Sequence, residues 1–179
     1  MSERARAWLV VTAVVALLAG GLGYLRTGNG ARRVRPGPAP LASPSFAPGT
    51  VGGLLPDVVL DGRNGGTPAR GLRPAVLLLT RPGCGCVTVV RQVVADATPL
   101  GIVTYVITAG PVADAERVAV QAGGDAGAFA DPGAVLATTY GLRTDAALVL
   151  VRSDGVVTQV VAGVAPSLRL DRSLRALLA

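Results

Sequence analysis

The chain lacks histidine and lysine altogether, and it has only two cysteines, one tryptophan and one methionine. Without histidine there is no imidazole for general acid–base catalysis, for a Ser-His-Asp triad or for a metal site. Hydrolases with such triads and metalloenzymes with imidazole ligands are therefore excluded. All seventeen basic residues are arginine.

Positive charge is scarce outside the N-terminal region. Residues 1–50 hold six arginines and one glutamate, a net of +5, whereas residues 51–179 hold eleven arginines and ten acidic residues, a net of +1. A nucleic-acid-binding protein needs a basic face on its folded part and aromatic side chains for stacking. Aromatic residues make up 3% of the chain, so we expect no nucleic-acid partner.

The N-terminus predicts a membrane segment over residues 1–26. Arg4 and Arg6 precede nineteen uncharged residues, 7–25. At 1.5 Å per residue a helix of that length spans about 28 Å, enough for the hydrocarbon core. The alternative is a signal peptide that is cleaved near Ala19-Gly20-Gly21, which would leave a secreted protein.

Orientation in the membrane is predicted less directly. Four arginines, at positions 26, 32, 33 and 35, follow the apolar run, and the positive-inside rule alone would keep the following domain in the cytoplasm. A short tail before the span and a long domain after it are the usual layout of an export signal-anchor. We therefore expect a single-pass plasma-membrane protein with its domain on the extracytoplasmic side.

Residues 27–50 are predicted to be a disordered linker, because they combine proline with glycine, alanine and serine and offer little to bury. Five prolines lie in this stretch, at positions 36, 38, 40, 44 and 48. The length that remains, 51–179, suits one domain.

Strand and helix patterns alternate along residues 51–179 and predict an α/β fold, a central sheet flanked by helices. Predicted strands cover 58–60, 75–80, 102–108, 147–151 and 156–161, and predicted helices cover 87–97, 111–122, 131 to about 140, and 166–178. The Asp154-Gly155 dipeptide predicts the turn of a late hairpin.

The two cysteines, Cys84 and Cys86, lie where the buried strand 75–80 leads into the helix 87–97. A helix N-terminus stabilises a thiolate, and Arg81 could act in the same direction or be a solvated surface charge. An accessible thiolate with a second cysteine in reach can attack a disulfide and then resolve the mixed disulfide. Redox chemistry is favoured over a structural clip, because a two-residue loop closed by a disulfide removes little chain entropy.

Four segments in order resemble the thioredoxin superfamily, in particular its membrane-anchored TlpA/MauD-like branch and its redoxin (AhpC/TSA) relatives. They are Gly53–Leu60 (GLLPDVVL), Ala75–Cys86 (AVLLLTRPGCGC), Phe129–Gly133 with Tyr140–Leu142, and Leu148–Gly155 (LVLVRSDG). The resemblance implies a thioredoxin-like domain over 51–179 and a thiol-disulfide oxidoreductase of the cell envelope. It also implies protein thiols and disulfides as substrates, a monomer, and no metal or cofactor. Cys84 then takes the role of the attacking thiol and Cys86 that of the resolving thiol.

The chain departs from the family pattern at three places. Gly83 replaces the usual tryptophan and the cysteines form C-x-C instead of C-x-x-C. Ala146 falls where a cis-proline is expected, so we predict a trans bond there, in a substrate loop in which Asp145 either tunes the thiol pKa or caps a turn. The buried acid of some relatives is replaced by Leu77–Leu79.

Two alternative functions remain open at this point. A degenerate thioredoxin-like domain could bind Cu(I) through the two thiolates, or could bind a partner protein. A thiol peroxidase of the redoxin type is the other alternative, although nothing of the form P-x-x-x-[ST]-x-x-C precedes either cysteine.

Overall fold

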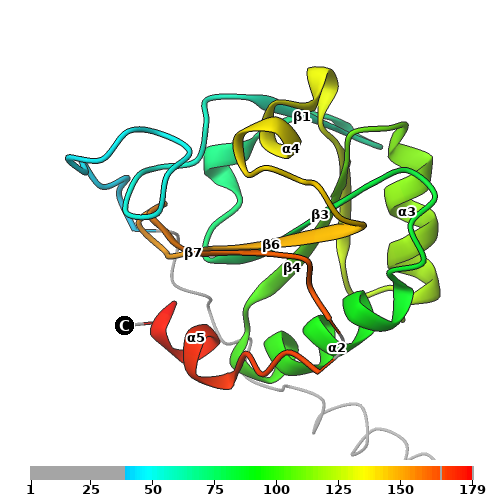
Figure 1. Ribbon diagram of the computed structural model, residues 1–179. Helices are drawn as coiled ribbons and strands as arrows, with labels where there is room; N and C mark the ends of the chain where they lie inside the picture. Colours follow the sequence, from blue (N-terminus) through cyan, green and yellow to red (C-terminus); the bar gives the residue numbers. More distant parts are fainter. Residues whose placement is uncertain (1–38, 166, 179) are drawn as a thin grey trace, which may run out of the picture. The chain divides into compact units, whose positions relative to one another are not determined.

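The computed structural model describes residues 39–165 and 167–178. Within them, one mixed seven-stranded sheet has the strand order β2-β1-β5-β4-β3-β6-β7 (Figure 1). The strands are β1 (Val59–Gly62), β2 (Gly65–Pro68), β3 (Ala75–Thr80), β4 (Val103–Thr108), β5 (Gly127–Ala130), β6 (Ala146–Val151) and β7 (Val157–Ala162). The helices are α2 (Val87–Ala97), α3 (Val112–Gln121), α4 (Val135–Thr139) and α5 (Asp171–Ala176).

Strand β3 lies near the centre of the sheet, parallel to β4 and antiparallel to β6. Its sequence is apolar at five of six positions and every residue is buried, as expected of a strand covered on both faces. Because successive side chains of a strand point to opposite faces, Val76 and Leu78 belong to one core cluster and Leu77 and Leu79 to the other.

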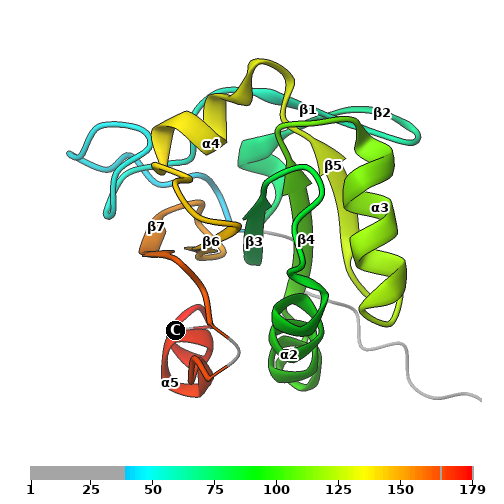
Figure 2. The ribbon, with the colours of Figure 1, turned by 45° about the vertical axis from the view of Figure 1, so that its right-hand side comes forward.

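Helices cover both faces of the sheet. Helices α2, α3 and α5 bury apolar side chains in the core cluster that contains Val76. Helix α4 packs on the opposite face through Leu136. Figure 1 shows α4 on one side of the β6–β7 hairpin and α2 and α5 on the other, and Figure 2 shows α2 and α5 lying next to each other. The predicted α/β fold is confirmed.

Most predicted elements are present, with three differences. Strands β2 and β5 were not predicted, because GGTP and GAFA are too short and too rich in small residues for a strand pattern to stand out. The predicted helix 166–178 begins only at Asp171. A turn precedes it, in which the Leu168 N–H donates to the Ala165 carbonyl.

The predicted membrane segment 1–26 lies outside the described residues. Among residues 39–165 and 167–178, no helix is both long and apolar enough to cross a bilayer. Residues 39–42, in the predicted linker, are hydrogen-bonded to the domain: Arg73 Nη1 donates to the Ala39 carbonyl (2.5 Å), and the Ala42 N–H donates to the Asp154 carbonyl (2.9 Å). These bonds fix that segment at the β6–β7 turn, beside the amino end of β3.

Candidate redox site

The loop between β3 and α2 begins with a tight turn. The Cys84 N–H donates to the carbonyl of Arg81 (3.2 Å), so Pro82 and Gly83 are the two central residues. Proline favours the first central position of a turn, and the second central position of a type II turn needs a positive φ. Gly83 has φ +74°. The sequence Pro82-Gly83 thus folds the chain back and delivers the cysteines to the start of α2.

Cys84 and Cys86 are joined by a disulfide, with their Cα atoms 5.3 Å apart. Cys86 is 5% exposed and belongs to the core cluster beneath α2, whereas Cys84 is half-buried and packs against the edge of that cluster. Cys86 is also the N-cap residue of α2, whose first helical bond runs from the Val90 N–H to the Cys86 carbonyl. Cys84 is therefore the more accessible of the two.

The segment 144–146, predicted to be a substrate loop, lies beside this loop. The Arg81 N–H donates to the Asp145 carbonyl (3.1 Å), and Ala146 is the first residue of β6, paired with Thr80. The Ala146 carbonyl accepts from Thr144 Oγ1 and from the Gly163 N–H, both at 3.1 Å. The peptide bond before Ala146 is trans, since Arg73-Pro74 is the cis bond of the described residues.

A groove of about 450 Å³ separates the two loops. Its lining is mostly backbone and small side chains: Gly85, Cys86, Thr88, Val89, Thr144, Asp145, Ala146, Gly163 and Val164. The groove borders the disulfide at Cys86. Asp145 is the one acidic residue in this lining.

The predicted site residues come together here. Cys86, Asp145 and Ala146 line the groove, and the Arg81 backbone joins its two loops. The Arg81 side chain is exposed. The sequence interpretation missed Gly163 and Val164, since glycine and valine after a strand give no signal of a site.

The loop between β4 and α3 also supports the site. A Cβ atom at Gly110 would lie 2.7 Å from Pro82 Cγ, a separation too short for two carbon atoms. Gly110 thus lets the redox loop pack closely on its neighbour. This contact was not predicted, because nothing in the local sequence links the two loops.

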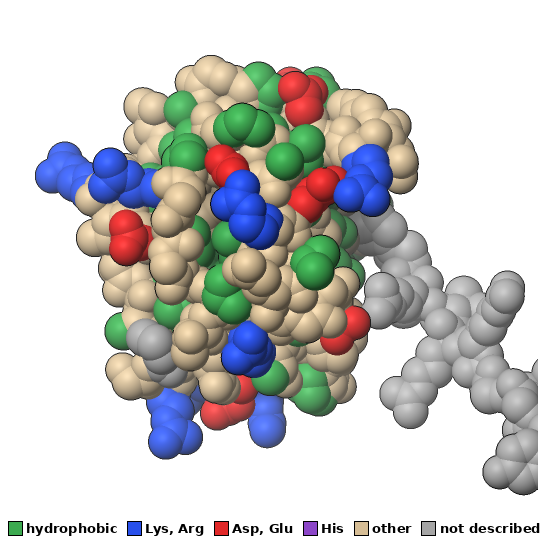
Figure 3. All heavy atoms as spheres, turned by 90° about the vertical axis from the view of Figure 1, so that its right-hand side faces the viewer, with side chains coloured by type: hydrophobic (Ala, Val, Ile, Leu, Met, Phe, Trp, Pro, Cys, Tyr) green, Lys and Arg blue, Asp and Glu red, His purple; other side chains and the backbone are tan. Residues whose placement is uncertain are grey.

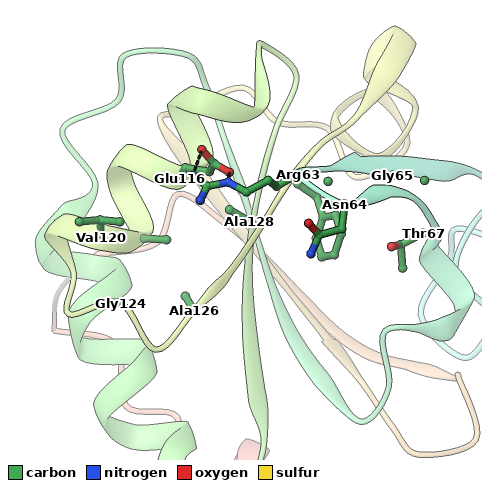
Figure 4. Close-up of a pocket in the computed structure, with 13 residues that line it drawn as sticks. Arg63, Asn64, Gly65, Thr67, Glu116, Val120, Gly124, Ala126 and Ala128 are labelled. Atoms are coloured by element: carbon green, nitrogen blue, oxygen red, sulfur yellow. Dashed lines mark hydrogen bonds and ion pairs between the residues drawn. The ribbon is translucent and has the colours of Figure 1, made fainter.

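A second hollow, of about 400 Å³, lies between the β1–β2 turn, α3 and β5. Arg63 Nε and Nη2 donate to the two carboxylate oxygens of Glu116, each at 2.9 Å, across one side of it (Figure 4). Each side chain holds the other charged: the pKa of Glu116 is lowered by the hydrogen bond from Arg63, and the pKa of Arg63 is raised. This pair ties the hairpin to α3 and contains no residue of the redox loop.

A metal site is not formed by the part of the chain that the structure describes: no group of three or more Cys, Asp or Glu residues could hold an ion there. The thiol groups of Cys84 and Cys86 are occupied in the disulfide.

Solved structures similar to this one are thioredoxin-like proteins. Mycobacterium tuberculosis dsbF, in mixed oxidised and reduced forms, has a TM-score of 0.56 at 17% identity, over 74% of this chain and all of its own. The chain has a thioredoxin-like fold. A secreted disulfide oxidoreductase of M. tuberculosis homologous to E. coli DsbE gives a TM-score of 0.52 at 15% identity, over 68% of this chain and 94% of its own.

Peroxiredoxin Q of Xanthomonas campestris also has this fold, with a TM-score of 0.52 at 17% identity over 68% of this chain and 90% of its own. Neither a family model nor a curated protein sequence matches the chain. At these identities the likeness concerns the fold, and the chemistry has to be argued from the residues of this chain.

Proposed function

We propose that the protein is a thiol-disulfide oxidoreductase that works through Cys84 and Cys86. One observation supports this most: the two cysteines form a disulfide at the carboxyl end of the central strand, beside an open groove. A structural role explains this position poorly, because so short a disulfide loop adds little stability. The thioredoxin-like fold of known disulfide oxidoreductases supports the same function.

The reaction divides between the two sulfur atoms according to their accessibility. In the reducing direction, the Cys84 thiolate attacks a substrate disulfide, forms a mixed disulfide and releases one substrate thiolate, which takes up a proton. The Cys86 thiolate then attacks Cys84 Sγ, closes the Cys84–Cys86 disulfide and releases the second substrate thiolate. Two electrons pass from the cysteine pair to the substrate, and the reverse sequence oxidises a dithiol.

Three further residues are proposed to assist. The positive charge of Arg81 and the N-terminus of α2 favour a thiolate at the pair, whereas the negative charge of Asp145 opposes it. Ala146 and its neighbours offer backbone groups along the groove to an extended substrate. The trans bond before Ala146 then gives this loop a different substrate-docking geometry from that of a cis-proline loop.

We further propose that residues 1–26 anchor the protein in the plasma membrane and that its domain acts on exported proteins outside the cytoplasm. The apolar run of residues 7–25 supports the anchor. The secreted location of one similar structure agrees with the extracytoplasmic side.

The test is the reduction potential of the Cys84–Cys86 pair in the full-length protein, measured by alkylation and mass spectrometry in defined glutathione buffers. We expect a reversible couple between about −270 and −120 mV, the range of catalytic pairs. A pair that stays oxidised below about −300 mV would indicate a structural disulfide and overturn the proposal. A pair that never forms a disulfide would point to Cu(I) binding instead.

A further inference from the structure

Helix α5 and the segment just before it carry three outward arginines. Arg169, Arg172 and Arg175 are exposed and three residues apart, while Leu170, Leu174 and Leu177 are buried against the core beneath α2. Because a helix turns 100° per residue, Arg172 and Arg175 lie on the side of α5 opposite Leu174, and Arg169 precedes the helix by two residues. The arginines also line a shallow depression of about 650 Å³ together with Asp171 and Ser173.

These three arginines differ from most other basic side chains of the domain, although the side chains of Arg81 and Arg143 also lack a partner among the described residues. In the described residues, Arg63, Arg70, Arg117 and Arg152 each pair with a carboxylate, and Arg73 and Arg91 donate to backbone carbonyls. No such partner is found among the described residues for Arg169, Arg172 or Arg175. Asp171 is the single acidic residue of α5.

Figure 3 shows the side of the domain that carries α3, where arginine and acidic side chains are interspersed. Two pairs of that kind belong to α3, which pairs Arg117 with its own Asp114 and Glu116 with Arg63. Mixed charges on α3 neutralise each other locally. At residues 169–175 three arginines outnumber one carboxylate, Asp171, so this segment keeps a net positive charge that is available to an anionic partner.

We infer that α5 docks the domain on an anionic phospholipid surface. This inference rests on the proposed N-terminal anchor, which holds the domain close to the bilayer. The domain is hydrogen-bonded from Ala39 onward, and twelve residues separate Ala39 from the proposed anchor 1–26. Twelve residues of any conformation span at most about 40 Å, so on this proposal the domain stays within reach of the lipid headgroups.

The affinity expected of three arginines for an anionic bilayer suits a domain that is already tethered to the membrane. An arginine close to an anionic leaflet strengthens association about fivefold, so three give roughly a hundredfold. A hundredfold gain in affinity gives only weak membrane binding for a free protein, but it is sufficient for a protein that an anchor already holds at the surface. The attraction acts within a Debye length, about 8 Å at physiological ionic strength, and should disappear in high salt.

Docking through α5 leaves the redox site open. No residue is shared between the depression lined by the three arginines and the groove beside Cys86. The groove lies between the start of α2, the start of β6 and the end of β7, whereas the arginines point away from the sheet. The domain can therefore stay at the membrane while its disulfide meets protein substrates.

The test uses the full-length protein with vesicles of phosphatidylcholine alone and of phosphatidylcholine with phosphatidylglycerol. Arginine modification by phenylglyoxal is followed residue by residue with mass spectrometry. We expect modification of Arg169, Arg172 and Arg175 to be at least fivefold slower with phosphatidylglycerol, and to recover in high salt. Arg143, which is exposed and outside α5, is the internal control and should react at the same rate on both vesicles.

Equal rates on the two vesicles would overturn the inference, and so would slower modification of Arg143 to the same extent. Flotation with phosphatidylcholine vesicles tests the anchor separately. A protein that does not float with them, but whose α5 arginines are still protected by phosphatidylglycerol, would remove the anchor and keep the docking face. Absence of both flotation and protection would remove both.

Discussion

Helices α2 and α4 both begin at the carboxyl edge of the sheet, and the N–H groups of their first turns find different partners. At α4, the carboxylate of Asp131 is 2% exposed and accepts from the N–H groups of Val135 (3.0 Å), Leu136 (2.8 Å) and Ala137 (3.1 Å). At α2, the N-cap residue is Cys86, and no side-chain bond caps the helix. The first turn of α4 is therefore capped by a buried carboxylate, whereas the first turn of α2 has no side-chain cap.

The two helices differ in what accepts hydrogen bonds from their first N–H groups. The first N–H groups of a helix have no partner within the helix and carry a partial positive charge. At α4 these groups are satisfied by Asp131, which makes that junction a structural one. At α2 no side chain accepts from them, so on the proposed mechanism they are available to the thiolate of the cysteine pair.

The largest effect on stability is expected from removing the carboxylate that caps α4. Asp131→Ala leaves one buried and two part-buried N–H groups without their charged acceptor, and we expect it to lower the free energy of unfolding by about 3 kcal/mol. Urea denaturation measures this. Thiol exchange below the unfolding transition should stay within about twofold, because Asp131 is not in the groove.

Asp125→Ala is the matched control, since Asp125 is exposed; we expect it to stay within about 0.5 kcal/mol of wild type. A loss at Asp125 as large as at Asp131 would contradict the capping argument.

A smaller effect on stability is expected from displacing the loop between β3 and α2, which carries the cysteines. Gly110→Ala brings a Cβ to within 2.7 Å of Pro82 Cγ, so the redox loop has to shift. Overpacking of this kind costs about 1–2 kcal/mol. Because the loop carries Cys84, the rate of exchange with a disulfide peptide should fall several-fold. Gly71→Ala is the control, as a Cβ there meets no atom within 4 Å.

How far the sequence predicts this site depends on how local each feature is. Strand β3 and helix α2 were predicted with the observed bounds, because a continuous apolar run and a regular apolar spacing are local patterns. The helix predicted to start at Asp131-Pro132 begins later: a short 3-10 turn covers Pro132–Ala134, and α4 starts only at Val135. The three hydrogen bonds to the Asp131 carboxylate were not predicted, since they depend on the burial of that residue by the rest of the fold.

The contacts around the cysteines join residues far apart in the chain, and most of them could not be predicted from the sequence. That Asp145 and Ala146 face Cys86 followed from the family resemblance alone. The approach of Gly110 to Pro82 and the place of Gly163 in the groove arise because three separate loops meet at one edge of the sheet. No periodicity within any one loop encodes such a meeting.

Adding a cap to α2 should stabilise the fold and remove its activity. Cys86→Ser puts a hydroxyl acceptor at the N-cap, where serine is favoured, and we expect a gain of up to about 1 kcal/mol relative to the reduced wild type. Cys84→Ser, two residues outside the helix, should bring no such gain. Both variants lose the disulfide and with it the catalytic cycle, so denaturation under reducing conditions separates capping from redox chemistry. Equal stability of the two would show that α2 has no uncapped first turn to fill.

The smallest effect is expected at the amino end of β3, away from both junctions. In the β6–β7 turn, Asp154 accepts hydrogen bonds from Arg152, which lower the pKa of Asp154 below its usual range, and from the Val156 N–H. A carboxyl whose pKa is lower in the folded state stabilises the fold above its unfolded pKa, about 3.9, and this stabilisation is lost as the pH falls through the folded pKa.

Asp154→Asn keeps an acceptor for Val156 but loses the charge, so we expect about 0.5 kcal/mol less stability at pH 7 and no difference near pH 2. Chemical denaturation of both proteins across this range, with thiol exchange measured in parallel, should find the difference only in stability and only above the pH at which Asp154 is protonated. A difference that persists in acid would mean that the turn geometry, and not the charge of Asp154, stabilises this end of the sheet.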